Sequence, residues 1–278
     1  MLPGGDCSKI WESRSLVGYN LIAPRQLEFK AEDGTKLYGW LMMPPDSTTA
    51  GNKIPLIVHI YGGPAGQTVT NSWGGDRFLF HQMLAKAGFA VFSVDNRGTP
   101  NRGRKFMSAL RLQFGGVELR DQLTALDQLL PQYPMIDPAR LAMWGWSNGG
   151  SMTLYSMTHS DRFKSGVSVA PVTDQHLYDS VYTERYMGLP VDNPKGYNDS
   201  IVASAGNLHG SLLLVHGLSD DNVHPQNSIQ MVNELIKSGK QFNFMVYPGK
   251  THGIAGKEAR AHLFHSIWDH FAQTLQSK

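Results

Sequence analysis

From about residue 54 onward, short apolar runs rich in β-branched residues alternate with longer stretches in which apolar residues recur every three or four positions. The first pattern predicts buried strands, and the second predicts helices that cover a sheet. Their alternation is typical of a mostly parallel sheet with helices on both faces. Strands are expected at 54–61, 89–95, 140–146, 165–170, 211–216 and 241–247, and helices at 78–87, 117–130, 149–159, 225–237 and 259–275.

Two earlier runs, 26–31 and 37–43, flank the pair Asp33-Gly34. An Asp-Gly pair between two strand-like runs is a strong hairpin signal, because both residues tolerate the positive φ of a tight turn. We therefore expect an antiparallel pair at the sheet edge, which brings the total to eight strands. The polar, Pro-rich segment 44–53 indicates a surface loop. The domain expectation is a lead-in over 1–24 and one α/β domain over 25–278.

The composition is that of a folded globular protein, with 41% hydrophobic and 17% charged residues. The formal net charge of +2 comes from scattered charges, so nothing indicates a nucleic acid or an anionic membrane as partner. No apolar run reaches the roughly 18 residues that cross a bilayer, and no signal peptide is recognisable. Cys7 is the only cysteine, and we interpret it as an incidental thiol.

The segment Gly145-Trp-Ser147-Asn-Gly149 matches the pattern G-x-S-x-G. A predicted strand precedes it and a predicted helix follows, which is the context of a nucleophile elbow. Such a turn is so sharp that side chains at the flanking positions would clash, and glycine removes the clash. The alternative, a Gly-rich turn without chemistry, does not explain this context. Ser147 is therefore the predicted nucleophile of an α/β-hydrolase fold.

A serine nucleophile needs a base, and in this fold an acidic residue and then a histidine follow it on loops after strands. Asp220 and Asp221 come just after the strand at 211–216, and their spacing does not decide between them. His252 lies in the loop after the strand at 241–247, immediately before a glycine. His252 is the best-placed base.

The other histidines are given structural interpretations. His262, His265 and His270 fall on the last predicted helix, where packed or solvated positions are expected, and no nearby Cys or carboxylate completes a metal-ligand set. We expect neither a metal nor a cofactor. His59 and His216 fall in buried strands, so hydrogen-bonded core histidines are predicted there.

An oxyanion hole needs donors aimed at the oxygen of the tetrahedral intermediate. The backbone N–H of Asn148 is one candidate, because it follows the nucleophile. The second donor is expected in the loop Tyr61-Gly-Gly-Pro64, after the strand that begins at 54. Either a backbone amide or the Tyr61 hydroxyl group serves this role.

Over about residues 25 to 275, the chain resembles the catalytic domain of the prolyl oligopeptidase family of serine peptidases, in its dipeptidyl peptidase IV branch. The motifs that carry the resemblance are HIYGGP at 59–64, DNRG at 95–98, WGWSNGG at 144–150, APV at 170–172, YDSVYTERYMGLP at 178–190, HG at 216–217, DDNVH at 220–224 and HGI at 252–254.

The resemblance implies a triad of Ser147, Asp220 and His252, and so selects Asp220 over Asp221. It implies the Tyr61 hydroxyl and the Asn148 amide as oxyanion donors. It further implies an apolar pocket for proline or alanine, and a side chain that binds a substrate carbonyl. The pocket residues are Val172, Tyr178, Tyr182 and Val223, and the carbonyl-binding residue is Asn222. The implied activity is release of dipeptides from the amino terminus of peptides through an acyl-enzyme on Ser147.

The chain departs from the family pattern at two pocket positions. Asn148 stands where the family has an aromatic residue, and Gln175 stands where it has tryptophan, so two apolar walls are missing. The family also carries a β-propeller whose paired glutamates hold the substrate amine, and nothing in this sequence encodes one. We therefore interpret residues 1–24 as a connector from a propeller of the same polypeptide.

The partners implied in this way are a peptide substrate, the propeller domain and a second copy of the chain. The resemblance also favours an exported or periplasmic protein over a cytoplasmic one. The alternative function is a free-standing esterase, broad acyl hydrolase or aminopeptidase that uses the same triad. A binding domain with a silent site is disfavoured because all three triad residue types are present.

Overall fold

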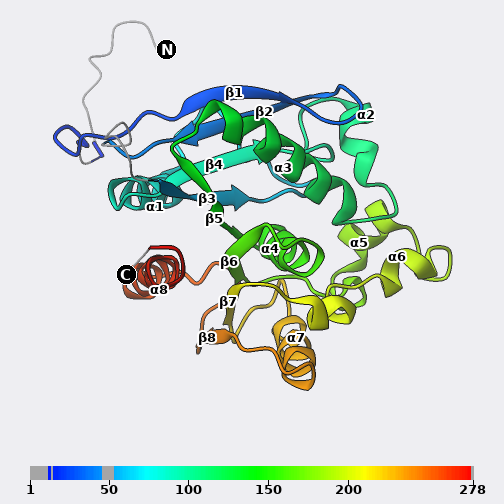
Figure 1. Ribbon diagram of the computed structural model, residues 1–278. Helices are drawn as coiled ribbons and strands as arrows, with labels where there is room; N and C mark the ends of the chain where they lie inside the picture. The colour runs from blue at the N-terminus through cyan, green and yellow to red at the C-terminus, as the bar shows by residue number, and fades with distance from the viewer. Residues whose placement is uncertain (1–11, 14, 46–52, 277–278) are drawn as a thin grey trace, which may run out of the picture.

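The computed structural model describes residues 12–13, 15–45 and 53–276 (Figure 1). Its centre is one sheet in the order β1-β2-β4-β3-β5-β6-β7-β8. Strands β3 to β8 are parallel, whereas β2 is antiparallel to both β1 and β4. The strands are β1 Arg25–Lys30, β2 Lys36–Met42, β3 Ile54–Ile60, β4 Ala90–Asp95, β5 Ile136–Trp146, β6 Phe163–Val169, β7 Ser211–Gly217 and β8 Asn243–Tyr247.

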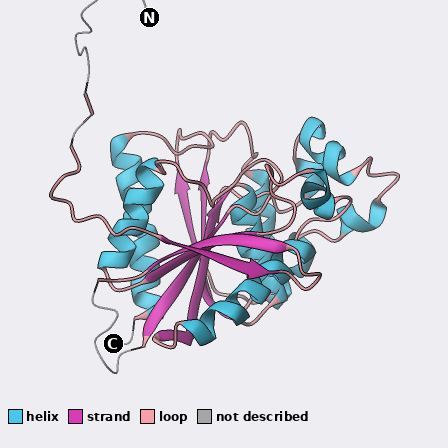
Figure 2. Cartoon of the chain, turned by 90° about the horizontal axis from the view of Figure 1, so that it is seen from above, coloured by secondary structure: helices cyan, strands magenta, loops and turns pink. Residues whose placement is uncertain are grey.

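Helices cover both faces of the sheet, as Figures 1 and 2 show. Apolar side chains of α1 and α8 pack on one face, and those of α3, α4 and α7 pack on the other. Because side chains alternate along a strand, Leu141 and Met143 of β5 enter one core while Trp144 enters the other. The helices are α1 Gly75–Lys86, α2 Arg104–Met107, α3 Gly116–Leu129, α4 Asn148–His159, α5 Ser180–Met187, α6 Pro194–Asn198, α7 Gln226–Lys237 and α8 Lys257–Leu275.

The edge hairpin is confirmed. Strands β1 and β2 pair antiparallel from Arg25↔Leu41 to Lys30↔Lys36. Gly34 has a φ of 81°, and the Asp33 carboxylate accepts the N–H of Thr35 at 2.9 Å. The Asp-Gly turn chemistry therefore places this pair at the edge of the sheet, as expected.

The fold differs from the sequence-based expectation at several elements, including the short helices α2 and α6, which were not expected, and the start of β6 at Phe163. Strand β5 and helix α5 are the clearest cases. Strand β5 begins at Ile136, four residues before the predicted start, because Ile136 pairs with Ile54 ahead of an irregularity in the register. Helix α5 was not expected, although Asp179 caps it by accepting the N–H of Tyr182 at 2.8 Å. Short connecting helices such as this one bury too few residues to show a clear apolar period.

Several expectations fall outside the described residues. These include the thiol of Cys7, half of the lead-in before residue 25 and most of the loop at 44–53. Within the described ranges, none of the helices combines the length and the apolar character needed to cross a membrane.

Candidate active site

Ser147 stands at a sharp turn between β5 and α4. Its φ of 60° and ψ of −122° are unusual for a residue with a side chain, and its N–H donates to the Val169 carbonyl at 2.8 Å. A Cβ atom on Gly149 would lie 2.1 Å from the Ile60 carbonyl oxygen, and one on Gly145 would lie 2.4 Å from Gly149. The predicted reason for both glycines is therefore confirmed.

Asp220 is buried after β7, at 3% exposure, and holds His252. Its Oδ2 lies 2.8 Å from His252 Nδ1, while its Oδ1 accepts the N–H groups of Asn222 and Val223 at 3.0 and 2.9 Å. Because an ionised carboxylate only accepts hydrogen bonds, Nδ1 of His252 is the donor and Nε2 is left as an acceptor. Asp221, by contrast, is exposed.

The ionised state of Asp220 is strongly favoured. Burial alone would raise its pKa, but hydrogen bonds from His216 and His252 and from the Val223 N–H lower the pKa overall. His216 is fully buried, with Nε2 2.9 Å from the Val223 carbonyl and Nδ1 2.6 Å from the Ser228 hydroxyl. The prediction of a hydrogen-bonded core histidine is thus confirmed for His216, which also lies 3.3 Å from Asp220.

Ser147 and His252 line one open cavity of about 340 Å³, although they are 105 positions apart in the chain. The Trp146 indole N–H donates to the His252 carbonyl at 2.9 Å and ties the histidine loop to the elbow. The other lining residues are Tyr61, Arg77, Trp146, Tyr178, Asn222, Gly253 and Arg260. The structure therefore brings the predicted nucleophile and base to the same cavity.

Two arginines on this cavity were not found from the sequence. Arg260 pairs with Asp76 at 2.7 Å, and its guanidinium lies 5.0 Å from the centre of the Trp146 ring. Arg77 lies over the same ring at 5.7 Å, and none of the described acidic residues forms an ion pair with it. No motif marks either arginine, because each lies at the start of a helix without a characteristic neighbour.

The expected oxyanion donors lie beside the nucleophile. Asn148 is the first residue of α4, so its backbone N–H has no acceptor within the helix. The Asn148 side chain donates to the Tyr61 carbonyl at 2.8 Å, a tie that the sequence did not indicate. Burial raises the pKa of Tyr61, which keeps its hydroxyl protonated and able to donate.

A smaller cavity of about 90 Å³ also reaches Ser147, and it shares Tyr61 and Tyr178 with the larger one. Tyr178 and Tyr182 meet edge to face with ring centres 5.4 Å apart, and the Tyr178 hydroxyl donates to Asn222 at 3.1 Å. Val223 is fully buried outside this lining, so its place in the pocket is corrected to a backbone role beneath Asp220. The lining residues are Tyr61, Ala65, Ser147, Asn148, Val172, Gln175, Tyr178 and Tyr182.

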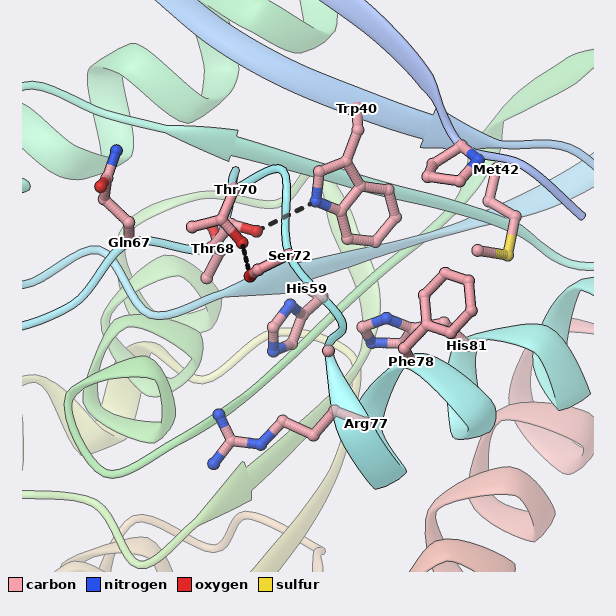
Figure 3. Close-up of a pocket in the computed structure, with 12 residues that line it drawn as sticks. Trp40, Met42, His59, Gln67, Thr68, Thr70, Ser72, Arg77, Phe78 and His81 are labelled. Carbon is pink, nitrogen blue, oxygen red and sulfur yellow. Dashed lines mark hydrogen bonds between the residues drawn. The ribbon is translucent and has the colours of Figure 1, made fainter. Parts of the chain in front are cut away.

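A third cavity, of about 200 Å³, lies beyond Arg77 between β2, β3 and α1 (Figure 3). His59 packs between His81 and Trp144 at ring distances of 4.7 and 4.8 Å, and its buried Nδ1 has no hydrogen-bond partner among the described residues. The prediction of a hydrogen-bonded histidine is therefore wrong for His59. Burial lowers its pKa well below the usual value, so a neutral ring tolerates aromatic packing there.

Within the described part of the chain, no three His, Cys, Asp or Glu side chains are grouped so as to hold a metal ion. The chemistry that the site offers is that of its own side chains: a hydroxyl at an elbow, an oriented imidazole, a buried carboxylate and neighbouring donors. This set is suited to acyl transfer.

Comparison with known proteins gives consistent matches. The family model described as the prolyl oligopeptidase family matches residues 78–278. Mouse dipeptidyl peptidase 8 is 36% identical over 261 residues, which cover 91% of this chain and 29% of that protein. The probable dipeptidyl-aminopeptidase B of Emericella nidulans is 39% identical over 227 residues, which cover 80% of this chain and 25% of that protein.

Solved structures are similar as well. The crystal structure of Porphyromonas gingivalis dipeptidyl peptidase 4 superposes with a TM-score of 0.86 at 35% identity. The superposed region covers 92% of this chain and 36% of the Porphyromonas gingivalis chain. A putative dipeptidyl aminopeptidase IV from Bacteroides ovatus gives a TM-score of 0.88 at 35% identity, with coverage of 93% and 37%. These matches confirm the expected α/β-hydrolase fold. The chain spans about a quarter to a third of the curated relatives it matches.

Proposed function

Because this chain belongs to the prolyl oligopeptidase family of serine peptidases, we propose that it is a serine peptidase in which Ser147, His252 and Asp220 act as one catalytic triad. The observation that carries the proposal is the 2.8 Å contact from Asp220 to His252 Nδ1, together with the cavity that His252 shares with the strained Ser147. This contact leaves His252 Nε2 free to accept the Ser147 proton.

In the acylation step, Ser147 Oγ forms a bond to the scissile carbonyl carbon while His252 Nε2 takes the hydroxyl proton. The tetrahedral oxyanion is bound by the Asn148 N–H and the Tyr61 hydroxyl. When the C–N bond breaks, His252 gives its proton to the leaving amine, and an ester on Ser147 remains. Water then attacks this ester with His252 again as base, which releases the acid and restores the serine.

For the substrate, we propose release of dipeptides after proline or alanine. The names of the relatives support the release of dipeptides, and the preference for proline or alanine rests on the family resemblance. The tyrosine-lined cavity beside Ser147 receives the side chain of the residue that becomes the acyl group. Asn222 accepts from Tyr178 through Oδ1, so its amide N–H₂ remains available for a substrate carbonyl.

The clamp for the substrate amine is a separate part of the proposal. Neither cavity beside Ser147 is lined by a carboxylate among the described residues. We assign this role to a propeller domain of the same polypeptide, and a second copy of the chain is the other proposed partner. Both assignments rest on the family resemblance.

A second candidate function is an esterase or broad acyl hydrolase. It is favoured by the open 340 Å³ cavity on the His252 side and by the polar Gln175 in the acyl pocket, since neither feature demands a peptide leaving group. Comparing Gly-Pro-anilide with short p-nitrophenyl esters separates the two functions. A peptidase cleaves the anilide efficiently, whereas an esterase turns over the esters alone.

The triad itself is tested by Ser147→Ala. This variant is expected to lose on the order of a millionfold in kcat on any substrate that the parent hydrolyses. Ser266→Ala, a partly exposed hydroxyl on α8 that lines neither cavity beside Ser147, is the matched control and is expected to retain parental activity. Equal rates for parent and Ser147→Ala would remove the proposed nucleophile.

A further inference from the structure

Two polar atoms in the wall of the acyl pocket lack a partner. The Gln175 side-chain oxygen and the Tyr182 hydroxyl are buried, and neither is hydrogen-bonded to another described residue. Both side chains line the cavity of about 90 Å³ that contains Ser147. Folded proteins seldom leave buried polar atoms unpaired, because the hydrogen bonds lost to water are not replaced. A purely apolar occupant leaves both of them unpaired.

The pocket is polar without being charged. None of the described side chains that line it is ionisable at neutral pH, because burial raises the pKa of Tyr182 and that of Tyr178 above their usual values. A carboxylate or ammonium group would enter without a counter-charge, at a high desolvation cost. The suitable occupant is therefore neutral and can both donate and accept a hydrogen bond.

Free volume lies behind the wall at Gln175. A further cavity, of about 30 Å³, shares Asn148, Val172 and Gln175 with the acyl pocket. Gln175 thus borders free volume in two cavities. This space lets the Gln175 side chain adjust to an occupant slightly larger than an unsubstituted pyrrolidine ring.

The backbone that carries Gln175 is nevertheless firmly held. The Val172 N–H donates to the Ser151 hydroxyl at 2.9 Å, and the Thr173 N–H donates to the Asn227 side chain at 3.0 Å. Asp174 then accepts the N–H of His176 at 2.9 Å and caps the short turn that Gln175 begins. A fixed backbone with an adjustable polar tip is suited to recognising one small group.

We propose that Gln175 and Tyr182 make the acyl pocket selective for a residue that bears a hydroxyl group. The substrate class is peptides with 4-hydroxyproline or serine at the position that acylates Ser147, in preference to proline or alanine. The inference rests on the proposed function, because it assumes acylation of Ser147. It assigns Gln175 a role in specificity, where the family resemblance suggested only a missing apolar wall.

The test uses two pairs of substrates that each differ by one hydroxyl group. These are the p-nitrophenyl esters of N-acetylproline and N-acetyl-4-hydroxyproline, and those of N-acetylalanine and N-acetylserine. Esters of this kind need no amine clamp, so they report on the acyl pocket of the chain as it stands. The readout is the ratio of kcat/KM within each pair, which does not depend on the fraction of enzyme that is folded.

In the parent, the hydroxylated ester is expected to be favoured by about fivefold in each pair, the effect of one neutral hydrogen bond. Gln175→Leu keeps the approximate shape and is expected to bring the ratio to one or below. Tyr182→Phe removes a single oxygen and is expected to lower the ratio as well. Gln273→Leu, an exposed position on α8, is the control and should keep the parental ratio.

Labelling of Ser147 by a fluorophosphonate probe shows whether a negative result contradicts only the inference about the acyl pocket or the proposed hydrolase function as well. If Ser147 is labelled and the esters are hydrolysed but the parental ratio is one, the inference is overturned while the hydrolase function stands. The same holds if Gln175→Leu retains the parental preference. If Ser147 is not labelled and no ester is hydrolysed, the proposed function fails, and the inference fails with it.

Discussion

Two cavities meet at Ser147. The smaller one, here called the small side, is uncharged and has tyrosines and a carboxamide in its wall, whereas the larger one, the wide side, is lined by two arginines. The small side holds the acyl part of the substrate in the proposed mechanism, and the wide side holds the leaving group. On this proposal, specificity for the acyl residue is expected to depend on close fit and single hydrogen bonds. Selection of the leaving group is expected to depend on longer-range charge.

Both cavities meet at Ser147, so a change in the triad is expected to slow hydrolysis of every substrate. This is the largest of the predicted effects. Asp220→Asn is expected to lower kcat by about 10⁴ for anilides and esters alike, because the uncharged amide no longer fixes the tautomer of His252. Asp221→Asn, at the exposed neighbouring position, should change kcat by less than about twofold. Steady-state kinetics on both variants would contradict the assignment if Asp221→Asn were the impaired one.

The turn at Ser147, which borders both cavities, is expected not to tolerate even one added carbon atom on its glycines. Gly149→Ala places a Cβ atom 2.1 Å from the Ile60 carbonyl oxygen, and should destabilise the fold by about 3 kcal/mol or more. Gly253→Ala has no atom within 4 Å of the new Cβ, and should change the free energy of unfolding by less than about 0.5 kcal/mol. Urea unfolding of both variants tests the contrast.

A buried carboxyl group near the small side makes stability depend on pH. Burial raises the pKa of Glu118 to about 7, while its Oε2 accepts the Gly115 N–H at 3.0 Å. Because the folded-state pKa lies above the unfolded value, the folded state binds the proton more tightly between pH 4.5 and 7, and this contribution is lost as the pH rises.

Between pH 5 and 8, the parent is therefore expected to lose on the order of 2 to 3 kcal/mol more stability than Glu118→Gln. The measurement is the free energy of unfolding of both proteins at several pH values. Parallel pH profiles would show that Glu118 is ionised in the fold throughout this range.

The role of the arginines on the wide side is tested by changing the charge of the leaving group. Arg77 has no described acidic partner, so it is expected to favour the tripeptide Gly-Pro-Ala with a free carboxylate over the same peptide with an amidated end. Arg77→Gln should reduce the acid-to-amide ratio of kcat/KM by roughly fivefold, and added salt should reduce it in the parent. Arg104→Gln is the control, because Arg104 is exposed and lines neither cavity beside Ser147. An unchanged ratio in Arg77→Gln would show that charge on this side does not select the leaving group.

The sheet was largely predictable because a buried parallel sheet leaves a strong local pattern in the sequence. The eight strands, the edge hairpin and the five long helices all have such a pattern, and the glycines at 145 and 149 follow from the geometry of the elbow. The start of β5 at Ile136 has no such pattern, because Asp137-Pro138 resembles a turn, whereas Ile136 just before it still pairs with Ile54.

The site was predictable only where a side chain belongs to a motif. The sequence indicated Ser147 and His252 through their flanking glycines, and family resemblance was needed to prefer Asp220. The arginines of the wide side depend on how α1 and α8 approach Trp146, which no local pattern encodes. The buried Val223 and the unpaired His59 likewise reflect three-dimensional packing.

The most direct test of the triad is the rate at which a fluorophosphonate probe labels the protein, with the labelled residue identified by mass spectrometry of its peptides. The proposed mechanism predicts a label on Ser147, and a rate that falls by more than roughly a thousandfold in His252→Ala. A label on another residue, or an equal labelling rate of Ser147 in His252→Ala, would contradict it.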